Sequence, residues 1–315
     1  MCSALVTEHW PEPVPRDDRV ANVGVVVRLY GSSNTHRLMP ARAALAIVSG
    51  VAPLGGKQRR AEERRNAERF MHDLLLYTPL AADSRKIAHR FLAERARINE
   101  LVWRPWLLRR SRLTGEEHWH AAHRGGRGCV VVFGHIGPYF AIPVILAQHR
   151  LYAHMVTAAH YWQPMRPGYL GLATLQLRRE YAEKPLGRRR LIPNDAPPGR
   201  LVELLEHGES ILIAFDAPGS ATTPFLGRSV MLGGGSATLA FRTKALVLPV
   251  NAERHGSRSD LRILPPIDPA DYPDPRSLRI AIARTFEPLV LAQPEALDLM
   301  GPPSPLVSEA LVASE

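Results

Sequence analysis

His135 is the residue of this chain whose neighbours best suit it to proton transfer. It follows the β-branched run Val-Val-Val-Phe at 130–133, and Gly134 and Gly137 flank it. A run of this kind between glycines predicts a buried central strand. The histidine is therefore expected at the carboxyl end of that strand, open to a cleft and beside backbone N–H groups. Acyl transfer needs such a base for the acceptor's proton and such donors for the developing oxyanion, although a histidine merely hydrogen-bonded in a loop gives the same pattern.

A second group of residues with chemical potential lies around Asp216. This aspartate ends an apolar, strand-like segment, so it is expected to face the same cleft. The glycine run at 233–235, with Gly234 at its centre, opens a predicted helix and exposes N–H groups suited to an anion or a thioester carbonyl. The run is neither a Walker loop, because no Gly-Lys-Ser/Thr follows, nor a dinucleotide fingerprint. A tight packing turn explains it equally well.

Segments with the composition of strands alternate with helical segments after residue 128. This alternation predicts an α/β fold with a mostly parallel sheet flanked by helices, and the charged, helix-forming segments before it predict a helical amino-terminal region. The expected strands are 130–133, 151–159, 191–194, 210–216 and 245–254. The expected helices are 40–55, 56–77, 83–111, 139–149, 168–182, 198–208 and 234–244.

A chain of 315 residues is long enough to bury one substantial core. Apolar residues make up 45% of it and charged residues 22%, a balance that excludes wholesale disorder. The predicted parts are a loosely ordered arm (1–38), a helical region packed on the core (39–112), the α/β core (113–300) and a flexible tail (301–315).

The positive charge of the chain comes almost entirely from arginine. The formal net charge is +10, and only four of the 40 basic residues are lysine. Guanidinium groups bind phosphates and carboxylates through paired hydrogen bonds and stay charged. One expectation is therefore a phosphate-bearing partner: an anionic membrane surface, a phosphopantetheine carrier, coenzyme A or a nucleic acid. The other is a genome bias toward arginine codons, spread over a solvated surface.

The cysteine content and the distribution of apolar residues indicate in which cellular compartment the protein is expected. Cys2 and Cys129 make neither a disulfide framework nor a zinc-site spacing, and Cys129 is expected as a small core residue. The first twenty residues hold four acidic residues and three prolines, unlike a signal peptide. Residues 128–148 are uncharged and long enough to span a bilayer, but glycines and prolines interrupt them. We expect a buried strand, a turn and a buried helix there, in a cytoplasmic protein.

Taken in order, these segments resemble the bacterial lipid A late acyltransferase family, within the lysophospholipid/glycerolipid acyltransferase superfamily. The resemblance covers roughly residues 58–296, and the succession of motifs is more specific than any one of them. The motifs are the charged helix containing Asn66, the segment from Thr114 into Gly134-His135-Ile136-Gly137, Arg178-Arg179, the segment from His207 to Asp216, Phe225-Leu226-Gly227-Arg228, the segment from Ala240 to Val250, and Pro294-Glu295.

The resemblance implies roles for several residues. His135 would be the base, and no metal or nucleotide cofactor would be needed. Arg178 and Arg179 match a family arginine that would neutralise a phosphate, and Arg242 matches an Arg-Thr-Gly-Ala stretch in which Lys244 here replaces the glycine. Gly137 and Gly234 complete the predicted substrate-binding set. Two arginines on a helix, or one in an ion pair, are also what a solvated face contains.

Two departures from the family pattern matter. The family motif is His-x-x-x-x-Asp/Glu, in which the carboxylate orients the histidine, whereas the fifth residue after His135 is Phe140. Either another carboxylate supports the histidine, with Asp216 the first candidate and Glu209 the second, or the acceptor is an amine or hydroxylamine, or catalysis is lost. The family also carries an amino-terminal membrane helix, which is here shortened to Ala43–Val51.

The sequence therefore predicts an acyltransferase. The donor would be an acyl group on a carrier protein or coenzyme A, or an aminoacyl-tRNA. The shortened anchor favours a small acceptor with an amine or hydroxyl, in specialised metabolism. The alternatives are a peripheral membrane enzyme that acylates a lipid of the lipid A type, docked through arginine-rich helices, and a non-catalytic binding protein derived from the fold.

Overall fold

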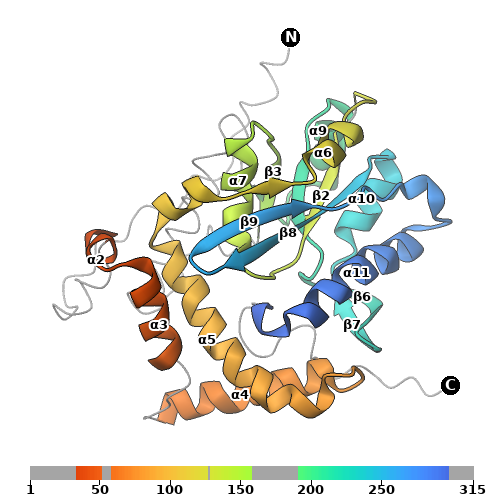
Figure 1. Cartoon of the computed structure of the whole chain (residues 1–315). Helices are drawn as coiled ribbons and strands as arrows, with labels where there is room; N and C mark the ends of the chain where they lie inside the picture. Colours follow the sequence, from red (N-terminus) through yellow and green to blue (C-terminus); the bar gives the residue numbers. More distant parts are fainter. Residues whose placement is uncertain (1–32, 52–57, 127, 158–190, 298–315) are drawn as a thin grey trace.

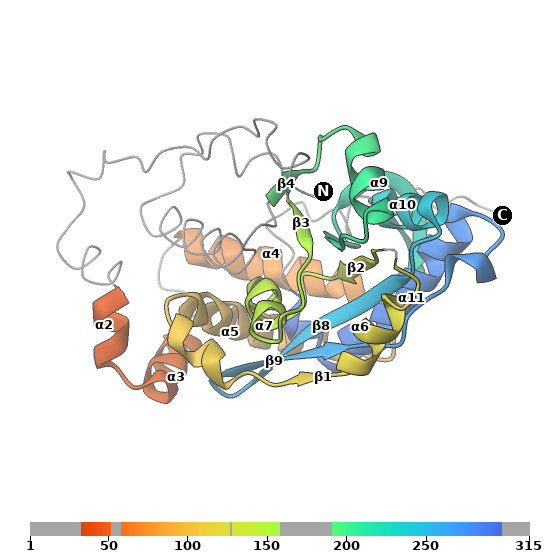
Figure 2. The ribbon, with the colours of Figure 1, turned by 90° about the horizontal axis from the view of Figure 1, so that it is seen from above.

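A seven-stranded sheet forms the centre of the molecule, and helices cover both of its faces (Figures 1 and 2). The strand order is β1-β9-β8-β2-β5-β3-β4. The computed structural model describes residues 33–51, 58–126, 128–157 and 191–297. The strands of the sheet are β1 (Leu113–Thr114), β2 (Val130–Phe133), β3 (His154–Thr157), β4 (Leu191–Pro193), β5 (Ile211–Ala214), β8 (Val247–His255) and β9 (Arg258–Ile263).

Two groups of helices and a separate hairpin surround the sheet. The helices before it are α2 (Ser33–Leu38), α3 (Ala41–Val51), α4 (Gln58–Leu75), η1 (Ala81–Asp83), α5 (Ser84–Val102) and η2 (Pro105–Arg110). Those within and after it are α6 (Glu116–Ala122), η3 (Tyr139–Ala141), α7 (Ile142–Gln148), α9 (Pro198–Glu206), α10 (Gly235–Thr243), η6 (Pro269–Asp271), α11 (Pro275–Ala292) and η7 (Pro294–Ala296). The hairpin is β6 (Pro218–Phe225) with β7 (Arg228–Leu232).

The sheet is mostly parallel, as the sequence predicts. Strand β2 pairs in parallel with β5 on one side and with β8 on the other. The pairs β3–β4, β3–β5 and β1–β9 are parallel too, and β8 and β9 form an antiparallel pair. Since β2 lies between two parallel neighbours, its carboxyl end opens on the edge where β5 and β8 also end.

The burial of β2 on both of its faces explains why its sequence is apolar at every position. Val130 and Val132 belong to the core cluster on one face of the sheet, and Val131 and Phe133 belong to the cluster on the other face. Successive side chains of a strand point to opposite faces, so a strand covered on both sides has no position for a polar residue. All four side chains are at most 2% exposed.

Helix α5 lies across the carboxyl edge of the sheet and joins the two halves of the core. Ile87 and Phe91 in its first half belong to one core cluster, whereas Ile98 and Leu101 in its second half belong to the other. Between them, Glu94 meets the end of β8. The helix therefore runs beneath the edge of the sheet that carries His135.

The structure departs from the expected elements in three places. The helix expected over 83–111 ends at Val102, because Pro105 cannot continue it and starts the 3₁₀ turn η2 instead. Residues 33–38, assigned by sequence to the loosely ordered arm, form α2. Strands β1 and β9, the β6–β7 hairpin, and helices α6 and α11 are not among the expected elements. The helix expected at 168–182 lies outside the described residues.

The uncharged stretch 128–148 folds as the strand, turn and helix expected of it. It contains β2, η3 and α7, and most of its residues are buried. Among the described residues, no helix combines the length and the apolar composition needed to cross a bilayer.

Cys129 is a core residue at the start of β2. It is fully buried, its Sγ lies 3.4 Å from Ser210 Oγ, and Ser210 in turn contacts His123. Burial raises the pKa of the Cys129 thiol to about 12, so the thiol is neutral near pH 8.

The reactivity of Cys129 tests this packing. In a Cys2→Ser variant, the folded protein is expected to resist iodoacetamide at mildly alkaline pH, because the neutral, buried thiol is neither nucleophilic nor accessible. Mass spectrometry should find complete alkylation only after unfolding in urea. Rapid alkylation of the native protein would contradict the burial of β2.

Candidate active site

His135 and Asp216 form a close pair at the carboxyl edge of the sheet. His135 Nδ1 lies 2.7 Å from Asp216 Oδ1, and the backbone N–H of His135 donates to Asp216 Oδ2 at 2.7 Å. The Asp216 side chain is 0% exposed and that of His135 is 22% exposed. Because a carboxylate accepts, Nδ1 carries the ring hydrogen, and Nε2 is the atom that can take a proton.

The register of the two central strands brings these residues together, although they are 81 positions apart. Phe133, the last residue of β2, pairs with Ala214, the last residue of β5. Phe215 N–H then donates to Phe133 O at 2.9 Å, which extends the pairing by a step. Two residues beyond the ends of the strands, His135 and Asp216 lie side by side. Their meeting is therefore a consequence of parallel pairing.

Phe140 occupies the place where the resembling family carries its acid, and it is a core residue. It is 4% exposed in η3 and packs in the same cluster as Ile142 and Ile145. The neighbouring Tyr139 places its ring 4.7 Å from that of His135, at 76°. One side of the His135 ring therefore contacts the ring of Tyr139, and the carboxylate that binds His135 is that of Asp216, after the end of β5.

Gly137 allows the loop after His135 to lie directly against β8. Its φ is +61°, and an added Cβ would meet the carbonyl oxygen of Ala252 at 2.3 Å. Its N–H donates to Ala296 O at 2.7 Å, and Ile136 bridges to Leu297. The loop is thus held between β8 and the turn η7.

Gly234 belongs to a glycine run whose first residue, Gly233, contacts the residue that follows Asp216. The preceding Gly233 donates its N–H to Ala217 O at 2.8 Å, and a Cβ on Gly219 would meet Gly233 at 2.5 Å. The glycine run is therefore a tightly packed turn, and it also directs the amino end of α10 toward this edge of the sheet. Its role in substrate binding stays a prediction.

Two of the predicted site residues lie at the opposite edge. Glu209 precedes β5, about 23 Å along the strand from Asp216 at 3.3 Å per residue, and its Oε2 lies 3.8 Å from His154 Nε2. Arg242 is exposed in the last turn of α10, just before β8 enters the sheet beside the start of β2. The structure brings neither to His135. Arg178 and Arg179 lie outside the described residues.

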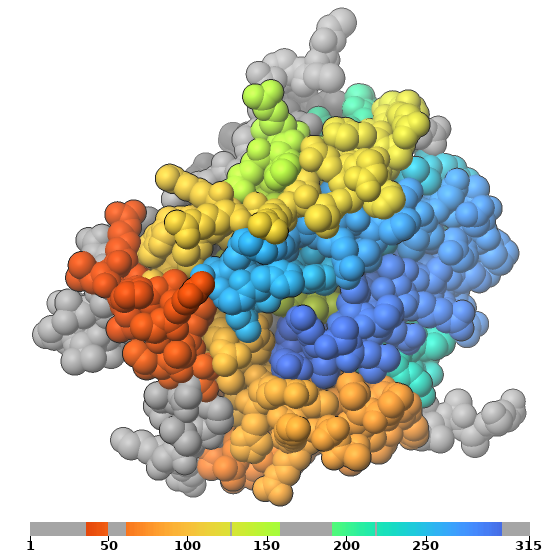
Figure 3. Space-filling view, viewed as in Figure 1, coloured from red at the N-terminus to blue at the C-terminus, as the bar shows by residue number. Residues whose placement is uncertain are grey.

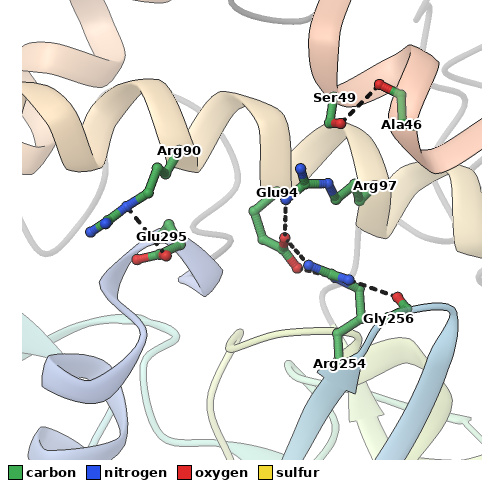
Figure 4. A network of polar contacts seen from close by, with 8 residues as sticks. All are labelled: Ala46, Ser49, Arg90, Glu94, Arg97, Arg254, Gly256 and Glu295. Atoms are coloured by element: carbon green, nitrogen blue, oxygen red, sulfur yellow. Dashed lines mark hydrogen bonds and ion pairs between the residues drawn. The ribbon is translucent and has the colours of Figure 1, made fainter.

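Sequence reasoning missed the polar network that attaches α5 to this edge (Figure 4). Glu94 accepts two hydrogen bonds from Arg254 at the end of β8, and Arg254 Nη1 also donates to Gly256 O at 2.6 Å. Arg90 Nε lies 3.4 Å from Glu295 in η7. Helix α5 is thereby tied to both segments that contact the His135 loop, β8 and η7.

One signal in the sequence could have revealed part of this network. Glu94 lies in register with Phe91, Ile98 and Leu101, so it belongs to the apolar stripe of its helix rather than to the solvated face. A carboxylate on such a stripe must have a partner inside the protein. The stripe alone does not identify the partner, because Arg254 lies 160 positions away in the sequence.

Comparisons with known proteins identify a matching family and a similar solved structure. The family model described as bacterial lipid A biosynthesis acyltransferase matches residues 31–297 of the chain. Among solved structures, the 1-acyl-sn-glycerophosphate (LPA) acyltransferase PlsC from Thermotoga maritima is similar, with 15% identity and a TM-score of 0.37, over 72% of this chain and 97% of that one. No curated protein matches.

Replacing Gly137 should show how much the close approach of its loop to β8 contributes to the free energy of unfolding. Gly137→Ala combines a positive φ with the contact to Ala252 O at 2.3 Å. Gly256→Ala is the matched control, because Gly256 has a φ of +65° and open space around its Cβ position. We expect the control to lose about 1 kcal/mol of unfolding free energy and Gly137→Ala to lose roughly 2 kcal/mol more. Equal losses in denaturant titrations would mean that the loop does not lie against β8.

Proposed function

The chain belongs to the bacterial lipid A biosynthesis acyltransferase family, and from this premise we propose that it transfers an acyl chain from a carrier-bound thioester to a hydroxyl group of a membrane lipid. The description of the family names lipid A, which favours the lipid acceptor that the sequence offered as an alternative. The small acceptor of specialised metabolism, preferred from the sequence because of the shortened anchor, has no support in the comparisons.

The His135–Asp216 pair is the observation that carries the proposal. A hydroxyl group keeps its proton at neutral pH, so it attacks a thioester only with the help of a positioned base. Asp216 holds the ring through the bond of 2.7 Å and would stabilise the imidazolium formed when His135 takes the proton. The missing family acid therefore gives no reason to invoke an amine acceptor or a protein that only binds.

The reaction would proceed in two steps. His135 Nε2 takes the proton of the acceptor hydroxyl as the hydroxyl oxygen attacks the thioester carbonyl carbon, which forms the new C–O bond and an oxyanion. The intermediate then collapses, the C–S bond breaks, and the leaving thiolate receives the proton from the imidazolium. Asp216 stays ionised throughout, and the ester and a free carrier thiol are the products.

The oxyanion needs donors other than the amides next to the histidine. The N–H groups of His135 and Gly137 already donate to Asp216 and to Ala296. Gly234 and Gly235 begin α10 near Asp216, and the first N–H groups of a helix lack partners within the helix. We assign the oxyanion to this amino end of α10.

The two candidate acids can be separated by matched amide substitutions. With an acyl carrier thioester as donor and a detergent-solubilised lipid as acceptor, Asp216→Asn should lower kcat by up to ~10⁴-fold, because it removes the partner that orients the base. Glu209→Gln should leave kcat unchanged, since Glu209 lies at the opposite edge, and His135→Ala should abolish turnover. The assignment fails if Asp216→Asn retains kcat or if Glu209→Gln loses it.

The product distinguishes the acceptor classes in the same assay. Mild alkaline hydroxylamine cleaves esters and leaves amides intact. Release of the acyl group from the product is the expected result, whereas a resistant product would show an amine acceptor.

A further inference from the structure

A groove lined by arginines lies beside the end of β8. It consists of two adjoining hollows of about 660 and 420 Å³ that share Arg42, Leu107, Arg110 and Ser257. Among the residues that the structure describes, no aspartate or glutamate lines either hollow. We call it the arginine groove after the residues Arg37, Arg42, Arg104, Arg109, Arg110, Arg112 and Arg258.

Part of this positive charge is not neutralised within the protein. Arg104 pairs with Glu100 and Arg258 pairs with Asp260, each at 2.8 Å. Arg42, Arg109 and Arg110 are exposed, and none forms an ion pair with any residue that the structure describes. Several such charges in one concave surface produce a field that attracts a polyanion.

The segment from α2 to α3, which lines one side of the groove, also exposes three apolar side chains, which we call the apolar rim. Leu38 is 88% exposed, Met39 41% and Ile47 54%. Trp106 lies in the groove with the guanidinium groups of Arg37 and Arg104 at 5.6 and 5.9 Å from its ring. Exposed leucine and isoleucine side chains, with a half-buried tryptophan that contacts arginines, are typical of segments that lie in a membrane interface.

The groove opens at the same edge of the sheet as the active site. Strand β8 pairs with β2, and continuing the register from Val132–Pro249 places Ala252 level with His135. The β8–β9 turn that lines the groove begins about 10 Å further along the strand. Figure 3 shows α2 and α3, in red, beside this turn, in blue, at one margin of the molecule.

We infer that the arginine groove and its apolar rim dock the enzyme on an anionic membrane surface, with the His135 edge turned toward the lipid. The phosphates of lipid headgroups would enter the groove, and Leu38 and Ile47 would enter the interface. The inference rests on the proposed function, because turning the His135 edge toward the membrane serves catalysis only if the acceptor is a lipid. An acidic carrier protein would satisfy the arginines, but a lipid surface also accommodates the apolar rim.

Vesicle binding tests the inference with a charge-matched control. The groove variant is Arg42→Gln, Arg109→Gln and Arg110→Gln together, and the control is Arg124→Gln, Arg276→Gln and Arg284→Gln, exposed residues away from the groove. Sedimentation with phosphatidylcholine–phosphatidylglycerol vesicles should show the groove variant binding roughly 100-fold more weakly, at about fivefold per arginine. The control should bind like the unaltered protein. Leu38→Gln with Ile47→Gln should weaken binding even in salt that screens charge.

Three outcomes would overturn the inference. They are equal binding of the groove and control variants, no preference of the unaltered protein for anionic over pure phosphatidylcholine vesicles, and loss of acyl carrier binding in the groove variant without loss of vesicle binding. Acyl transfer by the unaltered protein in detergent is measured in parallel. Transfer without vesicle binding rejects the docking surface alone, whereas vesicle binding without transfer rejects the proposed function.

Discussion

The parallel pairing of β2 with β5 is the constraint on which the proposed active site depends. Each strand ends where its last residue pairs with the other, Phe133 with Ala214, so the residues that follow leave the sheet together. A histidine and an aspartate two positions beyond are then neighbours by register, and the carboxylate binds both the ring and the backbone of His135. The histidine that we propose as the base is therefore positioned by the two buried central strands.

This origin of the acid has consequences for the rest of the site. With the carboxylate supplied from β5, the position five residues after the histidine is released for packing, and Phe140 fills it as a core residue. The loop can then be anchored elsewhere, at β8 through Gly137 and at η7 through Ala296. Helix α5 ties these two anchors together through Glu94 and Arg90, which places the helical amino-terminal region in the support of the catalytic edge.

Sequence reasoning recovered the parts of the fold that local patterns specify. The four-residue run of β2, buried on both faces, and the glycine-bounded α10 carry strong signals, and the mostly parallel sheet followed from their alternation. The sequence ranks Asp216 above Glu209, because Asp216 ends its predicted strand, but it does not show that this strand pairs directly with β2. The pairing of Glu94 with Arg254, 160 positions apart, lies beyond any local pattern. The hairpin β6–β7 was missed because Leu226-Gly227, its turn, adopts positive φ at a leucine.

The protonation of His135 tests most directly whether Asp216 replaces the family acid. In two-bond ¹H–¹⁵N correlation spectra of histidine-labelled protein, the His135 signals can be assigned by their loss in a His135→Gln variant. With Asp216 accepting from Nδ1, the neutral ring should carry its hydrogen on Nδ1, and Asp216→Asn should remove that preference. A ring in the unaltered protein that carries its hydrogen on Nε2, or one that Asp216→Asn leaves unchanged, would contradict the account.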